Sequence, residues 1–358
     1  FASTAPHGGV VAVVGDDPAA KSSTLPSSSD ATMVDLHMPV LFPGDVQEAL
    51  DLARHAAFLS RACGLWAGLK VVTPVADGNG TIDCSLDRVV PVLPTAEFDG
   101  RPFRPHPDGN LIGPHTLDME REFFEVRTDL ARQYAALNGL NRVTVRTTDD
   151  WIGIAASGHT YHEVREALHL LGLPDDAALQ AAGIRLIQLL APVSLDKYAL
   201  REFADGLSDV FVIEEKNPTL ELLVRDALYD LAVRPRVWGK RDEHGNIVVP
   251  YHGMLDADRL LPGLRHHLGK RLPDRLVPER PKATRDLIPL TVNRAPYYCS
   301  GCPHNTSTRN EPGTLVGGGI GCHGMIALMD PERVGDMVAL TCMGNEGAQW
   351  IGMAPFVE

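Results

Sequence analysis

WIGIAASGHTYHEVREALHLL, residues 151–171, joins a short apolar run to an amphipathic segment through a Ser-Gly turn. The run predicts a strand, and the apolar spacing after the turn predicts a helix. The order repeats downstream, because IRLIQLL (184–190) is typical of a strand and VFVIEEKNPTLELLVRDALY (210–229) of a strand followed by a helix. Short strands alternating with helices predict an α/β fold with mostly parallel sheets.

The N-terminal part shows the same alternation. GGVVAVVGDDP (8–18) predicts a parallel strand that is covered on both faces, because its β-branched run is continuous. A short strand is expected near residues 38–42. A helix is expected after the cap candidate Asp45, and LWAGLKVVT (65–73) predicts another strand.

Other stretches predict connections. Residues 75–115 are rich in Pro, Gly and Asp and predict an excursion, followed by a helix over 117–138. RLPDRLVPERPKATRDLIPL (271–290) carries four prolines among mixed charges, which is typical of an interdomain linker. A Ser-rich loop is expected over 22–29.

Bulk composition excludes several classes of protein. A net charge of -13 over 358 residues argues against nucleic-acid and anionic-membrane partners. No apolar run approaches the ~18 residues of a membrane span. Six cysteines are too few for a disulfide framework, so we expect a reducing compartment, by default the cytoplasm. The chain opens without methionine and stops directly after GNEGAQWIGMAPF, so we expect an internal segment of a longer polypeptide.

Three cysteines form the pattern C-x2-C-x19-C: Cys299, Cys302 and Cys322. This spacing indicates a metal centre, and it leaves two interpretations open. One is a structural Cys3His zinc site completed by His304 or His323; the other is a [4Fe-4S] cluster whose fourth cysteine lies elsewhere.

The other three cysteines give weaker signals. Cys342 ends a predicted strand, where a small buried thiol is ordinary, although it could serve as a fourth ligand. Cys63 and Cys84 have no partner pattern and are most simply structural.

A glycine run overlaps the third cysteine. Gly319, Gly321 and Gly324 match G-x-G-x-x-G, but no acidic residue follows about twenty positions on, so a dinucleotide site is not favoured. We interpret the run as main chain that approaches an anion closely, either cluster sulfide or phosphate.

Three further groups carry competing interpretations. For His159, His162 and Glu163, a helix capped by Ser157 or Thr160 is favoured over a metal site, because the order is not H-E-x-x-H. Glu214 and Glu215 end a predicted parallel strand, where acids can be functional or simply solvated. A substrate-pocket or domain-interface role and plain turn chemistry are equally expected for Asp16, Asp17, Lys21, Ser22 and Ser23.

Several stretches together resemble one family. YCSGCPHNTSTR (298–309) with GIGCH (319–323) is similar to the start of the diphosphate-binding domain in 2-oxoacid:ferredoxin oxidoreductases, most closely the large, fused indolepyruvate type. The first strand and its GDDPAAKSS turn resemble the end of that family's pyrimidine-binding domain. GIAASGHTYHEVREAL (153–168) and VFVIEEK (210–216) resemble its transketolase C-terminal-like domain, and TCMGNEGAQWIG (341–352) its next block.

The resemblance implies a thiamine diphosphate enzyme with Mg2+. Such an enzyme decarboxylates a 2-oxoacid, here indolepyruvate or another aryl pyruvate, and transfers the acyl group to coenzyme A. Electrons pass through a [4Fe-4S] cluster to ferredoxin or a similar acceptor. A homodimer is implied, since thiamine sites of this class form between facing domains.

The resemblance also implies site residues. Cys299, Cys302 and Cys322 would ligate the cluster with a fourth cysteine from farther downstream, which makes Cys342 a bystander. Thiamine diphosphate would contact a set that flanks the third cysteine and a later turn, namely Ile320, Gly321, His323, Met343 and Gly344. The glutamate that activates the cofactor would precede the chain and the Mg2+ motif would follow it, so we expect this segment alone to be inactive.

The implied domains are the C-terminal part of a pyrimidine-binding domain with its excursion, a connecting helical segment, a transketolase C-terminal-like domain, a linker, and the start of a diphosphate-binding domain. Their expected bounds are 1–115, 116–148, 149–270, 271–296 and 297–358. Two alternatives remain: a non-redox protein with structural zinc, and a transketolase-type thiamine enzyme without a cluster.

Overall fold

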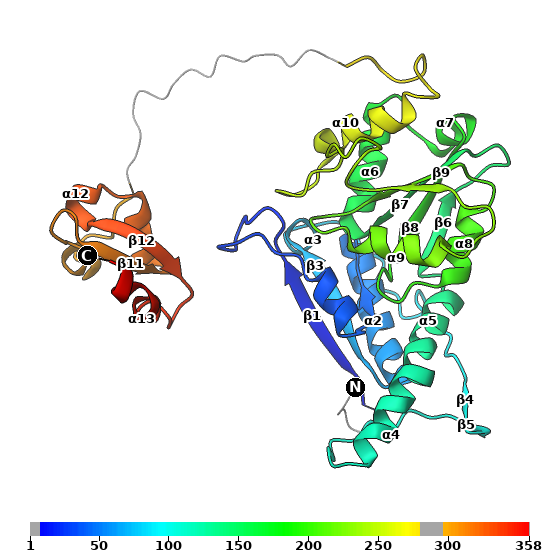
Figure 1. Cartoon of the computed structure of the whole chain (residues 1–358), viewed down its shortest axis with the longest axis horizontal. Coiled ribbons are helices and arrows are strands. Elements are labelled where there is room, and N and C mark those ends of the chain that lie inside the picture. The colour runs from blue at the N-terminus through cyan, green and yellow to red at the C-terminus, as the bar shows by residue number, and fades with distance from the viewer. Residues whose placement is uncertain (1–7, 280–295, 358) are drawn as a thin grey trace. The chain divides into compact units, whose positions relative to one another are not determined.

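The computed structural model describes residues 8–279 and 296–357. They belong to two compact units, one ending at Glu279 and one formed by the later residues, and each is described by itself (Figure 1). Residues 280–295, most of the linker expected over 271–296, lie outside the described residues.

A three-stranded parallel sheet opens the first unit. Its order is β1 (Val10–Asp16), β3 (Trp66–Val72), β2 (Val40–Leu41). Helix α2 (Val46–Cys63) packs on this sheet and begins as predicted, because the Asp45 carboxylate accepts the main-chain N–H of Glu48.

Strand β1 is parallel, as expected, but it is not covered on both faces. It lies at the edge of the sheet, and Val13 is 72% exposed. The β-branched run therefore predicted the strand correctly. The prediction that both of its faces are covered was wrong, because the segments that cover a sheet are distant in sequence.

Short elements and a long helix connect this sheet to the next. Two short helices flank the sheet, α1 (Asp30–Asp35) and α3 (Thr73–Ala76), and the excursion contains a small hairpin of β4 (Glu97–Phe98) and β5 (Arg101–Pro102). The predicted helix over 117–138 is present as α4 (His115–Glu122), a π-helical turn (Phe123–Arg127) and α5 (Thr128–Leu137).

The second sheet has five strands in the order β10-β9-β7-β8-β6. Four are parallel: β7 (Ile152–Ser157), β8 (Ile184–Leu189), β9 (Asp209–Ile213) and β10 (Arg236–Trp238). The edge strand β6 (Asn141–Val145) is antiparallel to β8 and lies within 116–148, where only a helical connection was expected. The α/β class with parallel sheets is confirmed.

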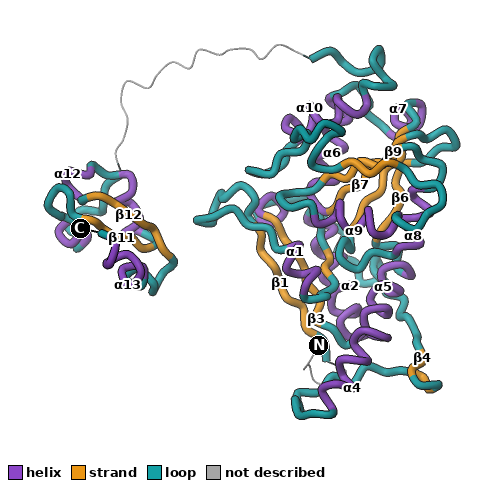
Figure 2. Tube along the Cα trace, in the orientation of Figure 1, coloured by secondary structure: helices purple, strands orange, loops and turns teal. Residues whose placement is uncertain are grey.

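Helices cover both faces of this sheet (Figure 2). One core contains α6 (Gly158–Leu170), α7 (Asp176–Ala181) and α10 (Ala257–Leu268). The core on the opposite face contains α8 (Lys197–Ala204) and α9 (Thr219–Leu228). Strands β8 and β9 lie on opposite sides of β7, and the helices that follow β7 and β9 leave toward opposite faces. The gap between β7 and β9 is therefore a topological switch point.

The second unit is small. Strands β11 (Leu315–Gly319) and β12 (Asp336–Thr341) form a parallel pair over a core that includes Tyr298, Ile326 and Val334. Short helices complete it: α11 (His304–Ser307), a 3-10 helix (Cys322–Leu328), α12 (Pro331–Val334), α13 (Gln349–Met353) and a 3-10 turn (Ala354–Phe356). None of the described helices combines the length and apolarity needed to cross a bilayer.

Candidate functional sites

A tight turn presents the first two cysteines of the motif. The N–H of Cys302 donates to the carbonyl oxygen of Cys299 at 3.0 Å, and Gly301 between them adopts φ +77°. Glycine takes this left-handed conformation without steric strain, so the turn can be this short. Both thiols are free, Cys299 exposed and Cys302 half-buried.

Cys322 is placed by the glycine run. It follows Gly321, which adopts φ +95° just beyond the end of β11, and its thiol is free and exposed. Cys342 directly follows β12 and is exposed, so the expectation of a buried thiol there is wrong. Because Gly319 pairs with Thr341 in the parallel register, Cys322 and Cys342 both follow the carboxyl end of the same strand pair.

Two histidines lie beside the cysteines. His304 Nδ1 is 3.3 Å from the Cys302 sulfur, and the rings of His304 and His323 stack with centroids 6.1 Å apart. His323 Nδ1 accepts the N–H of Gly319 at 3.2 Å. In the described part of the second unit, no three potential ligand atoms lie within 4.8 Å of one another. A zinc ion would need its ligands drawn closer, since Zn–S bonds are only about 2.3 Å long. Thiolates bind zinc and iron-sulfur clusters alike, so the three free thiols are compatible with either centre.

The residues expected to contact thiamine diphosphate come together at one edge. Ile320, Gly321 and His323 follow β11, while Met343 and Gly344 follow its neighbour β12. Met343 is 75% exposed, and Gly344 adopts φ +87°. Carboxyl ends of parallel strands are where open α/β sheets bind ligands. The edge can therefore present exposed main chain to a phosphate-bearing cofactor.

Sequence reasoning missed Glu346 at the same edge. A Cβ added to Gly319 would lie 2.6 Å from the Glu346 carboxylate, so the glycine permits this close approach. Main-chain N–H groups of Glu346 itself and of Gly344 lower the pKa of the Glu346 carboxyl, which favours its ionised form. The available signal was an acid in the turn GNEG, directly after the strand.

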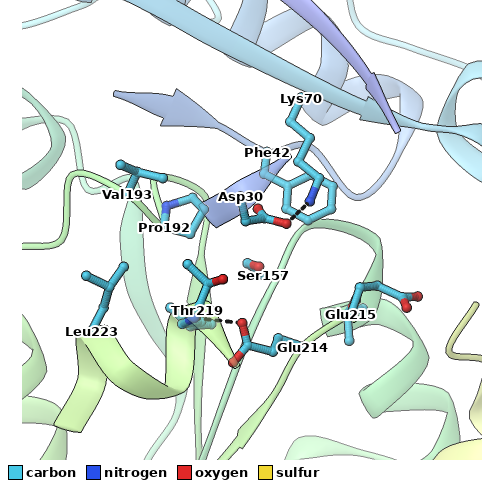
Figure 3. Close-up of a pocket in the computed structure, with 12 residues that line it drawn as sticks. Asp30, Phe42, Lys70, Ser157, Pro192, Val193, Glu214, Glu215, Thr219 and Leu223 are labelled. Carbon is cyan, nitrogen blue, oxygen red and sulfur yellow. Dashed lines mark hydrogen bonds and ion pairs between the residues drawn. The ribbon is translucent and has the colours of Figure 1, made fainter. Parts of the chain in front are cut away.

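A second candidate site is a pocket at the switch point of the first unit (Figure 3). It joins the carboxyl ends of β7, β8 and β9 to the first sheet. Its lining is mixed, with charged, hydroxyl and apolar side chains: Asp30, Phe42, Lys70, Ser157, Thr160, Pro192, Val193, Glu214, Glu215, Thr219, Leu220 and Leu223.

Lys70 is the buried cation of this pocket, and the sequence analysis did not single it out. Its ammonium forms a short ion pair with Asp30, lies 3.3 Å from Asp16 and lies 4.4 Å from the centre of the Phe42 ring. Its neighbours come from separate segments, and only the fold brings them together.

Glu214 and Glu215 are buried, at 8% and 9% exposure, so the expectation of solvated acids is wrong. Glu214 accepts the N–H groups that begin α9, and the Lys240 ammonium donates to its main-chain carbonyl. Burial raises the pKa of both glutamates and lowers that of Lys240. Such opposed shifts are common at functional sites.

The turn after β1 contains two acids, and they have different roles: one stabilises the turn and the other pairs with Lys70. Asp17 performs turn chemistry, since its carboxylate accepts the N–H groups of Lys21, Ser22 and Ser23 at 3.0, 2.7 and 2.8 Å. These bonds lower the pKa of Asp17. Asp16 instead belongs to the Lys70 cluster.

The structure does not gather His159, His162 and Glu163 into one ligand set. His159 pairs with Glu163 at 3.0 Å, whereas His162 faces Glu48 of α2 at 3.6 Å. Ser157 occupies the cap position of α6, yet no side chain caps this helix, so the expected hydroxyl cap is wrong.

The fold and these sites define a multi-domain α/β protein with a cysteine-rich candidate metal centre. Residues 142–276 match the indolepyruvate oxidoreductase domain. The chain is 25% identical over 345 residues to the indolepyruvate oxidoreductase subunit IorA of Pyrococcus abyssi, covering 93% of this chain and 50% of the relative. It is 27% identical over 308 residues to IorA of Archaeoglobus fulgidus, covering 86% and 45%.

Residues 142–276 thus match the indolepyruvate oxidoreductase domain, and the resemblance seen in the motifs of the chain is confirmed. The chain spans about half the length of the curated relatives it matches. Among solved structures, a 2-oxoglutarate:ferredoxin oxidoreductase from Magnetococcus marinus matches at 13% identity and a TM-score of 0.45, covering 74% of this chain and 50% of that one.

Proposed function

We propose that this chain is part of an enzyme that oxidatively decarboxylates a 2-oxoacid, indolepyruvate or another aryl pyruvate, to the acyl-CoA. The electrons leave through a [4Fe-4S] cluster to ferredoxin or a similar acceptor. The observation that carries the proposal is the match over 93% of the chain to an indolepyruvate oxidoreductase subunit, together with the free thiols of the C-x2-C-x19-C motif.

Cys299, Cys302 and Cys322 would hold the cluster through their thiolates. A bound cluster would supply one-electron redox chemistry, which thiol side chains alone do not provide. The turn at Gly301 and the left-handed Gly321 support this role, because they hold the cysteines on exposed, short main-chain segments.

Ile320, Gly321, His323, Met343 and Gly344 would line the thiamine diphosphate site, with Mg2+ bound to the diphosphate. The cofactor supplies carbanion chemistry when bound. The parallel pairing of β11 with β12 supports this assignment, since it brings both sets to one edge. His323 already accepts the Gly319 N–H through Nδ1, so Nε2 is the nitrogen that remains for contact with a ligand.

The test is the metal content of the protein purified anaerobically within its full-length polypeptide. We expect a brown protein with broad absorption near ~400 nm and about four iron atoms per site. A colourless protein with one zinc would overturn the cluster assignment and favour the structural Cys3His alternative. A colourless, metal-free protein that still turned over 2-oxoacids would favour a transketolase-type enzyme.

Substrate and partners are tested by the same preparation. Indolepyruvate with coenzyme A should reduce ferredoxin, and omission of thiamine diphosphate or Mg2+ should abolish the reaction. Equal rates with 2-oxoglutarate and indolepyruvate would contradict the aryl-pyruvate assignment. Sedimentation should give a homodimer.

A further inference from the structure

A groove on the first unit is lined by four arginines, and we call it the arginine groove. It runs along the edge strand β10 and has a volume of about 630 Å3. Arg225 comes from α9, Arg234 from the loop before β10, Arg236 from β10 itself and Arg241 from the segment after it. Volumes of this size are typical of small-molecule sites.

Three of these arginines have no carboxylate partner among the described residues. Arg234 and Arg241 each donate to one main-chain carbonyl, those of Tyr229 and Gly245. Arg236 makes no hydrogen bond or ion pair to any residue that the structure describes. A guanidinium group has five N–H donors. Most of the donors of these three side chains are therefore available to a ligand.

Aromatic rings orient two of the three guanidinium groups. Arg234 lies 5.2 Å from the centre of the Tyr229 ring, and Arg236 lies 5.7 Å from the centre of the Trp238 ring. Such contacts attract a cation to the ring without neutralising its charge. Tyr229 is itself 69% exposed, so the groove combines positive charge with an accessible aromatic surface.

Two carboxylates also line the groove, and both already accept hydrogen bonds from the chain. Glu221 accepts from the Arg225 guanidinium and from the main-chain N–H of Lys240. Asp242 accepts the N–H groups of the turn over 244–246. Four guanidinium groups against two carboxylates leave the lining with an excess of positive charge, although the net charge of the chain is -13. The groove therefore attracts anions.

Protection of an edge strand does not explain all four arginines. Charged side chains on an edge strand can prevent pairing with another chain. Arg225 covers the edge in this way, because its guanidinium donates to the main-chain carbonyl of Val237 at 2.6 Å. The guanidinium groups of Arg234, Arg236 and Arg241 make no bond to β10. Their charge is surplus to that protection.

We propose that the arginine groove binds a nucleoside diphosphate. The diphosphate oxygens accept hydrogen bonds from Arg234, Arg236 and Arg241, since a guanidinium fork matches a pair of phosphate oxygens. The base stacks on the exposed Tyr229 ring. A ligand with a single carboxylate would leave most of these donors without an acceptor, whereas a diphosphate offers oxygens to all three side chains.

Calorimetric titration of the full chain at low salt tests the ligand class with ADP, AMP, adenosine and pyrophosphate as probes. ADP should bind saturably and about tenfold more tightly than AMP, because the second phosphate meets further guanidinium donors. Added salt should weaken this binding. ADP binding that does not saturate, or that is no tighter than AMP binding, would overturn the proposal. A glutamate-rich peptide that bound more tightly than ADP would also overturn it, in favour of a protein-docking groove.

Variants locate the site. Arg236→Ala and Arg241→Ala should each weaken ADP binding about tenfold. Arg104→Ala removes the same charge at an exposed arginine of the excursion and should leave ADP binding unchanged. Tyr229→Ala should weaken the binding of ADP but not that of pyrophosphate.

ADP binding unchanged in Arg236→Ala would overturn the assignment. This variant is expected to fold, because the Arg236 side chain is exposed and makes no hydrogen bond to a described residue. The readout is binding, so it stands apart from any redox assay of the function proposed above.

Discussion

The Lys70 ammonium lies 3.3 Å from the Asp16 carboxylate, and each side chain is 3% exposed. Lys70 belongs to β3 and Asp16 ends β1, its parallel neighbour. The same ammonium pairs with Asp30 at the start of α1. This cluster therefore ties the first sheet to the loop that borders the switch-point pocket.

Lys70→Met should destabilise the first unit by about 3–5 kcal/mol, because it leaves buried carboxylates without a cation. Urea unfolding followed by circular dichroism measures the change. Lys21→Met is the matched control, since the Lys21–Asp77 pair is exposed and should contribute less than about 1 kcal/mol. Equal losses of unfolding free energy in the two variants would show that the buried cluster stabilises the unit no more than the exposed pair does.

Gly153→Ala should destabilise the same unit by about 1–3 kcal/mol through overpacking. A Cβ at Gly153 would lie 2.5 Å from the Phe203 ring and 2.6 Å from Leu207, both in the core. Gly15→Ala is the control, because a Cβ at this other strand glycine meets nothing within 4 Å. A shift of the thermal midpoint in the control but not in Gly153→Ala would contradict the packing.

His267 should make stability fall at acid pH. Burial against Phe211 and Trp238 lowers the pKa of His267 to about 4, whereas the unfolded chain has the ordinary value of 6.5. The unfolded state therefore binds more protons between these values, and stability is lost as pH falls from about 7 toward 4.

His267→Phe should flatten the dependence of the unfolding free energy on pH between 7 and 5. His169→Gln, at an exposed position on α6, should leave the slope unchanged. If the unfolding free energy depended on pH with the same slope in wild type and His267→Phe, His267 would not be the cause of that dependence.

Cys322→Ser should lose iron and visible absorption, whereas Cys342→Ser should retain both, because the fourth ligand is expected from farther downstream. Iron analysis of anaerobic protein checks this. Cys84→Ser, at an exposed thiol outside the motif, controls for nonspecific effects. Loss of iron in Cys342→Ser would make Cys342 the fourth ligand.

Local patterns predicted much of this fold. The period of apolar residues in 151–171 gave the correct order of β7 and α6, and Asp45 marked the start of α2. These signals are reliable because hydrogen bonds within a helix, and the caps that begin it, join residues only a few positions apart. The resemblance of the quoted motifs to the indolepyruvate oxidoreductases is also confirmed by the comparisons.

Burial and partnership could not be predicted in this way. Val13 is exposed, against expectation, and the burial of Glu214 excludes only one of the two interpretations left open for it, because the covering layers come from remote segments. The ion pair of Lys70 with Asp16 joins residues 54 positions apart in the printed numbering. Charged side chains enter a low-dielectric interior only where the tertiary fold supplies partners, and no local period encodes that. The alternation of strands and helices could thus be predicted from the sequence, whereas the switch-point pocket exists only once two sheets have packed together.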